Sequence, residues 1–206
     1  MYSFPFFYFR VMQFDIQETV TGGSEIVSLS EAKAHLRVSY SDEDTMITRM
    51  IKTAREWVEQ YTQQILIDKT LTVQFYDLAG ELRFELPFGP VDSITSVKRI
   101  LADGTEQTLV EGTNYRAQGL SRKVLKFNQF YSSGALGGDY QLKVVYDVIT
   151  QTKDQTVYQD AILKLVEDMY RNRGNSESEN PRGGISGKAQ IDCGKLLAEV
   201  KHKTWL

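Results

Sequence analysis

One long amphipathic stripe constrains the fold of this chain more than any other feature. Apolar side chains recur at steps of three and four residues across 46–61, the period of an α-helix with one buried face. The acidic run at 41–44 suits a helix N-terminus and its dipole. We therefore predict a long helix over about 42–63, with charged residues on its other side. The stripe consists of Met46, Ile47, Met50, Ile51, Ala54, Trp57, Val58 and Tyr61, and the charged side of Arg49, Lys52, Arg55, Glu56 and Glu59.

The hydrophobic period changes to two residues in the middle of the chain. Apolar residues alternate with polar ones around Val73 and around Phe84, as in half-buried strands. The pair Asp103 and Gly104 predicts a hairpin turn after a strand at 94–101. Further strands are expected near 107–110, 123–127 and 141–146. The segment 69–150 is therefore expected to form an antiparallel β unit inserted between helices.

Two shorter helical segments accompany the long one. Ser28, followed three residues later by Glu31, has the form of a capping box and begins a helix over about 28–37. A second apolar stripe predicts a helix over about 157–173 that ends at Gly174. The expected fold is α+β, with a small helical bundle core at 28–68 and 151–174 and the β unit at 69–150. An extended N-terminal arm at 1–27 and a flexible linker with a docking tail at 175–206 complete this division.

Both ends of the chain leave alternatives open. The aromatic run at 1–10 lacks the features of a signal peptide, so either Met12 is the true start or the run is an arm that packs on a neighbouring subunit. The apolar tail beyond the linker either docks on a partner or packs back on its own core. On the docking interpretation the candidate partner-binding residues are Leu196, Leu197, Trp205 and Leu206, and deleting 189–206 is expected to abolish docking while the core stays folded.

The charged and reactive residues favour no catalytic site. The net charge of −3 is too mild to indicate nucleic-acid binding by bulk electrostatics, although Arg171 and Arg173 form a local basic patch at a helix end. That patch either compensates the helix dipole or contacts nucleic acid or an acidic partner. Cys193 is the only cysteine, so no intrachain disulfide can form, which fits assembly in a reducing cytoplasm. No base is predicted beside Cys193, so a catalytic thiol is not indicated. The glycine-rich run at 183–188 lacks the spacing and the hydroxyl of a phosphate loop, and no cofactor or metal ligand set is predicted.

The order of these segments resembles a known family. The helix at 28–38 reads SLSEAKAHLRV, the long helix carries AREWVEQY at 54–61, and the β unit opens on LPFGPVDSITSV at 86–97. A strand ending in VVY at 144–146 and the helix AILKLVEDMYRNR at 161–173 follow. This combination resembles the gp6-like head–tail connector (adaptor) proteins of tailed phages, in their longer form with a β insertion.

The resemblance implies a structural virion protein and not an enzyme. Such a subunit forms a ring of about twelve copies at the portal vertex, joins the portal to the tail and extends the DNA channel. The implied partners are further copies of the chain, the portal protein and a tail, stopper or tail-terminator protein. DNA is expected to pass through the lumen without specific binding, and no membrane is involved. The implied location is the neck of the virion, after assembly in the host cytoplasm. The alternative function is a nucleic-acid-binding phage or prophage adaptor that acts through the basic patch.

Overall fold

The computed structural model describes residues 13–76, 82–101, 103–120, 122–128, 141–150, 155–173, 185–198 and 200. The chain divides into two compact units. The helical unit comprises the described parts of 20–69, 87–91 and 148–206, and the β unit those of 1–19, 70–86 and 92–147. The expected α+β fold class is confirmed.

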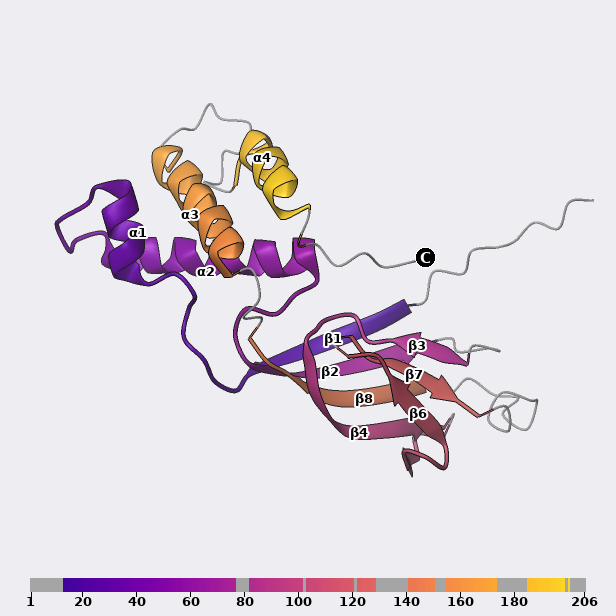
Figure 1. Cartoon of the computed structure of the whole chain (residues 1–206). Helices are drawn as coiled ribbons and strands as arrows, with labels where there is room; N and C mark the ends of the chain where they lie inside the picture. Colours follow the sequence, from indigo (N-terminus) through magenta and orange to yellow (C-terminus); the bar gives the residue numbers. More distant parts are fainter. Residues whose placement is uncertain are drawn as a thin grey trace, which may run out of the picture. The chain divides into compact units, whose positions relative to one another are not determined.

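Helices α1 (Leu29–Leu36), α2 (Asp44–Thr62), α3 (Gln155–Arg171) and α4 (Gly187–Leu197) build the helical unit (Figure 1). The capping box predicted for α1 is present. The Ser28 hydroxyl accepts a hydrogen bond from the Glu31 backbone N–H at 3.2 Å, and the Glu31 carboxylate accepts one from the Ser28 N–H at 2.7 Å. Helix α2 lies within the predicted range and ends at Gln63, which adopts a left-handed conformation with φ of 59°.

The core of the helical unit forms where the predicted stripes meet. Helix α3 contacts α1, α2 and α4, and α2 also contacts α1. The side chains that pack there are almost wholly excluded from solvent, so their burial supplies the main stabilising free energy of this unit. They include Ile47, Ile51, Ala54 and Val58 of α2 and Ala161, Ile162, Leu165 and Val166 of α3.

The β unit consists of two sheets. The five-stranded sheet has the order β1 (Gln13–Val20), β2 (Lys69–Tyr76), β8 (Gln141–Val148), β4 (Val91–Ile100), β5 (Glu106–Leu109). The three-stranded sheet has the order β3 (Arg83–Glu85), β7 (Val124–Phe127), β6 (Tyr115–Gln118). Strands β4 and β5 pair antiparallel across the turn predicted at Asp103 and Gly104, where the Gly104 N–H donates to the Leu101 carbonyl at 2.9 Å.

Aromatic rings connect the two sheets of the β unit. The Phe75 ring of β2 lies 5.5 Å from the Phe84 ring of β3, and Phe84 meets Phe127 of β7 edge-on at 5.5 Å. Phe14 of β1 and Tyr115 of β6 extend this row at 5.8 and 5.7 Å. These tilted and edge-on contacts are the favourable geometries for aromatic pairs, so the row holds the sheets face to face.

Two elements differ from the expectation for the chain ends. Residues 13–20 form strand β1 of the larger sheet, where the sequence predicted an arm. Within the predicted tail, residues 187–197 form helix α4, which packs on α3. The aromatic run at 1–10, Met12, the linker at 174–184 and the loop at 129–140 lie outside the described residues.

Candidate protein interface in the helical unit

Helix α4 places the predicted tail residues on the helical unit. Its N-cap is Ser186, whose hydroxyl accepts a hydrogen bond from the Ala189 N–H at 3.2 Å. The Asp168 carboxylate of α3 accepts hydrogen bonds from both the N–H and the hydroxyl of Ser186, each at 2.8 Å. Asp168 thereby anchors the start of α4 to α3.

The apolar side of α4 faces the core of its own unit. Leu197 is fully buried, Cys193 is 1% exposed, and the Cys193 thiol lies 3.7 Å from the Ala161 carbonyl. Burial raises the pKa of this thiol above its ordinary value, because water is excluded from the thiolate. The Tyr61 hydroxyl of α2 donates to the Gly194 carbonyl at 3.1 Å, so α4 also contacts the end of α2.

The predicted docking residues therefore separate into three groups. Leu197 packs on the chain's own core, which is the alternative left open by the sequence, because its side chain continues the buried stripe of α4. Leu196 is partly buried at the margin of that core. Trp205 and Leu206 lie outside the described residues. A deletion of 189–206 would remove Leu197 and Cys193 from the core, so it does not separate docking from folding.

Arg171 and Arg173 make ion pairs within the helical unit. The Arg171 guanidinium lies 2.5 Å from the Glu167 carboxylate one turn earlier, and its side chain is 74% exposed. Arg173 lies 3.2 Å from Glu43 and stacks over the Tyr170 ring at 3.8 Å. Arg173 is thus engaged by α2 and α3, whereas Arg171 remains accessible to a partner.

The Glu43 carboxylate, at the N-terminus of α2, accepts hydrogen bonds from the loop before α2 and from the end of α3. Its carboxylate accepts hydrogen bonds from the hydroxyls of Tyr170 at 2.5 Å and Tyr40 at 3.0 Å. The Tyr170 hydroxyl is the main reason that the pKa of Glu43 is lowered, with smaller contributions from Tyr40 and Arg173. The cluster ties the loop before α2 to the last turn of α3.

A buried network of charged side chains was not predicted from the sequence. Arg55 and Glu59, expected on the solvent side of α2, are 2% and 3% exposed. The Arg55 guanidinium donates to Glu59 at 2.7 Å and to Glu25 at 2.9 Å. Lys69 Nζ donates to Glu59 at 2.8 Å. The expectation was wrong because both residues border the apolar stripe and acquire partners from the segments that precede and follow α2. Their opposite charges four residues apart were the available signal.

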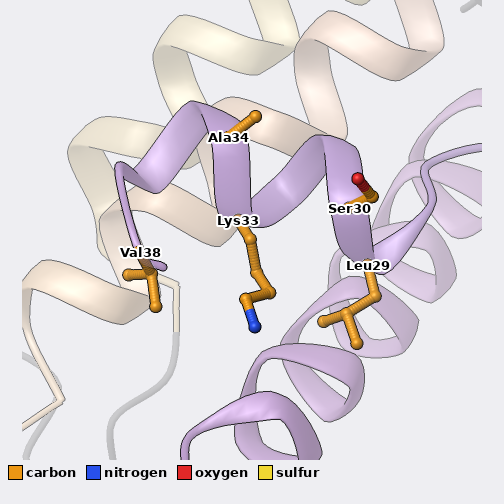
Figure 2. A pocket seen from close by; sticks show the side chains of 5 residues that line it. All are labelled: Leu29, Ser30, Lys33, Ala34 and Val38. Atoms are coloured by element: carbon orange, nitrogen blue, oxygen red, sulfur yellow. The ribbon is translucent and has the colours of Figure 1, made fainter. Parts of the chain in front are cut away.

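A shallow hollow lies along α1. Its volume is about 600 Å³, and Leu29, Ser30, Lys33, Ala34 and Val38 line it. Figure 2 shows the side chains of Leu29, Lys33 and Val38 pointing to the same side of the helix. Lys33 is its one charged group and lies 2.5 Å from Asp44. The hollow brings together no set of polar groups suited to acid–base chemistry, so its apolar lining suits contact with another surface.

A polar cluster on the five-stranded sheet has a structural role. The Asp147 carboxylate of β8 accepts hydrogen bonds from Thr70 of β2 at 2.6 Å and from Ser93 and Thr95 of β4 at 3.0 and 3.1 Å. The Thr70 hydroxyl is the largest cause of its lowered pKa. The cluster links three neighbouring strands, and its carboxylate is stabilised as an anion.

The chain is an α+β protein in which the described polar clusters have structural roles. They cap helices, form ion pairs and link neighbouring strands. No group of three or more potential metal ligands occurs among the described residues. None of the described helices is long and apolar enough to span a membrane.

Residues 26–124 match the family described as phage gp6-like head-tail connector protein. This match confirms the resemblance inferred from the order of segments. The family is one of structural connectors and not an enzyme class. No curated protein matches the chain.

Solved structures of particle necks share the fold. A chain described as the neck of an empty GTA particle with C6 symmetry aligns with a TM-score of 0.62 at 15% identity, covering 92% of this chain and 97% of that chain. A chain from the virion of a native gene transfer agent (GTA) particle aligns at 0.61 with 18% identity, covering 93% and 97%. The neck of a native GTA particle with C12 symmetry aligns at 0.55 with 16% identity, covering 92% and 97%. These matches extend the shared fold across both units.

Proposed function

We propose that this chain forms a ring at the portal vertex of a tailed phage, where it joins the portal to the tail and extends the DNA channel. The observation that carries the proposal is a neck-protein fold over 92% of the chain, together with a connector match over 26–124. The neck structures are described with C6 and C12 symmetry, which supports a closed ring of about twelve copies. Its place is the virion neck, after assembly in the host cytoplasm.

The part of the chain proposed to meet the portal is the segment after α4. Leu196 lies at the margin of the helical core, and Trp205 and Leu206 follow beyond the described residues. Tryptophan is frequent among the residues that dominate binding energy at protein interfaces. Arg171, which is 74% exposed, is a candidate contact for an acidic partner surface. A tail, stopper or tail-terminator protein is the proposed partner on the opposite face of the ring.

Particle imaging tests this proposal directly. The purified full chain is examined by negative-stain microscopy and mass photometry, alone and with the portal protein of the same phage. Rings, or rings that form when portal is added, are the expected result. A chain that stays monomeric at all concentrations and does not bind portal would falsify the proposal.

A short truncation tests the proposed portal contact. Removal of 201–206 deletes Trp205 and Leu206 but leaves α4 and its buried side chains in place. We expect weaker portal binding with an unchanged melting temperature. A truncated chain that binds portal with the affinity of the full chain would remove the tail from the interface.

The alternative function, a nucleic-acid-binding adaptor acting through Arg171 and Arg173, has a separate test. Arg173 is held by Glu43 and Tyr170, so its availability to DNA is reduced. If this patch binds DNA, R171Q should weaken a salt-sensitive shift of duplex DNA. An unchanged shift in R171Q would exclude the patch as the DNA contact.

A further inference from the structure

A row of three cations crosses the small sheet of the β unit. Arg83 of β3 lies directly opposite Lys126 of β7, and Lys126 lies directly opposite Arg116 of β6. Strand β7 lies between the other two (Figure 1), so the row runs straight across the sheet. All three side chains are exposed. Because directly paired residues share one face, the three positive charges lie side by side on the outward face.

This arrangement costs the isolated chain stability. Like charges directly opposite each other on neighbouring strands are destabilising. The described residues give neither Arg116 nor Lys126 an ion pair. Glu85, the acidic side chain on the same face, lies 3.4 Å from the buried Arg122. Among the described residues, no acidic side chain therefore neutralises Arg116 and Lys126, and a polyanion that contacts this face would relieve the repulsion between them.

We infer that the outward face of the β3–β7–β6 sheet is a sequence-independent contact surface for the phosphate backbone of duplex DNA. Neighbouring strands lie about 4.8 Å apart, so the row spans about 10 Å. Each strand of duplex DNA carries one phosphate per about 3.4 Å of helix axis. A row of this length lies within reach of two or three phosphates of one strand, because Arg and Lys side chains are long and flexible. Arginine adds a planar fork of donors suited to phosphate oxygens.

The composition of the face favours DNA over an acidic protein. Protein interfaces normally contain a buried apolar or aromatic centre. Here the aromatic rings of the small sheet, Phe84, Tyr115 and Phe127, belong to the inward rows. The outward positions besides the cations are Glu85, Val124 and Gln118, so the face offers charge without an apolar anchor.

Fluorescence anisotropy with a labelled duplex and the full chain tests this inference. For one copy with three phosphate contacts, raising the salt from 50 to 200 mM should weaken binding about 40-fold. In R116Q/K126Q one cation remains, so the same change should weaken binding only about 3-fold. Affinity at 50 mM should also fall by about tenfold or more. The matched control R49Q/K164Q removes two exposed cations of the helical unit, and its binding should equal that of the unmodified chain.

The melting temperature of a variant distinguishes the loss of a DNA contact from the loss of folded structure. Because K126Q relieves the like-charge row, its melting temperature at low salt should equal or exceed that of the unmodified chain. No DNA binding at 50 mM salt, or equal losses in R116Q/K126Q and R49Q/K164Q, would overturn the inference. It is likewise overturned if R116Q/K126Q loses portal binding but keeps DNA binding, since the face would then contact protein.

The inference rests on the β unit of one chain and not on ring assembly. Rings that do not bind DNA would overturn it and leave the proposed function intact. A chain that binds DNA through the row but never forms rings would overturn the proposed function alone.

Discussion

The Lys69 ammonium lies 2.8 Å from the Glu59 carboxylate, and both side chains are more than nine-tenths buried. Glu59 belongs to α2 and Lys69 begins β2. The same carboxylate accepts hydrogen bonds from Arg55 at 2.7 Å and from the Leu66 N–H at 2.8 Å. The segment that leaves α2 is therefore held to the helix by one buried anion.

Replacing this anion should destabilise the protein strongly. In Glu59→Gln the Arg55 and Lys69 charges stay buried without full compensation, which typically costs about 3–5 kcal/mol in the free energy of unfolding. Urea denaturation followed by circular dichroism measures this loss. The control is Glu56→Gln, whose half-exposed carboxylate lies 3.9 Å from Lys52 and 3.8 Å from Arg55 and should contribute less than about 1 kcal/mol. A loss below about 1 kcal/mol in Glu59→Gln would contradict the role given to this network.

Cys193 should be unreactive in the folded chain. Its thiol is buried between α4 and α3, and burial raises its pKa, so both access and thiolate population are low. Modification by an aromatic disulfide reagent should be at least about a hundredfold slower in buffer than in guanidinium chloride, because it requires local opening of α4. Equal rates in the two conditions would mean that α4 does not stay packed on the core. Cys193 is the only cysteine, so the signal reports this position alone.

Gly119 should tolerate no side chain. Its φ is 104°, and an added Cβ would lie 2.0 Å from the Arg122 carbonyl oxygen, so the turn between β6 and β7 would have to shift. Gly104 also has a positive φ, of 84°, but nothing lies within 4 Å of its added Cβ. Gly104→Ala should therefore cost about 1 kcal/mol and Gly119→Ala clearly more, measured by denaturant unfolding. Equal losses would show that the clash at Gly119 is relieved without cost.

Acid should weaken the link between Glu43 and the end of α3. The pKa of Glu43 is lowered from its ordinary value, first by the Tyr170 hydroxyl and then by Tyr40 and Arg173. A lowered pKa in the folded state means that the stabilisation is present above the ordinary value and is lost as the pH falls through the folded value. The melting temperatures of the unmodified chain and Glu43→Gln should therefore differ at pH 7, and the difference should shrink as the pH falls below the ordinary pKa of a glutamate.

The matched control for this titration is Asp42→Asn, an exposed neighbour in the same loop. Its melting temperature should follow that of the unmodified chain over the same range. A difference between Glu43→Gln and the unmodified chain that persists unchanged to pH 3 would show that the charge of Glu43 does not hold the link.

The sequence by itself determined the local elements of this protein. The stripe through Ile47, Ala54 and Val58 set α2, the pair Ser28 and Glu31 set the start of α1, and Asp103 with Gly104 set the β4–β5 hairpin. Each of these signals acts between residues close in the chain, through side-chain period, capping or turn conformation. The ordered combination of these elements was also enough to indicate the connector family.

Only the tertiary structure decided what lies far apart in sequence but close in space. Burial of Arg55 and Glu59 depends on Glu25 and Lys69, which no helical period can place beside them. Leu197 packs inward as part of the buried stripe of α4, a helix whose first residues are held to α3 by the hydrogen bond between Ser186 and Asp168. The row of Arg83, Lys126 and Arg116 exists only through strand register, since cross-strand neighbours are set by sheet pairing. Long-range pairing depends on the packing of the whole chain, so the candidate sites were less predictable than the fold.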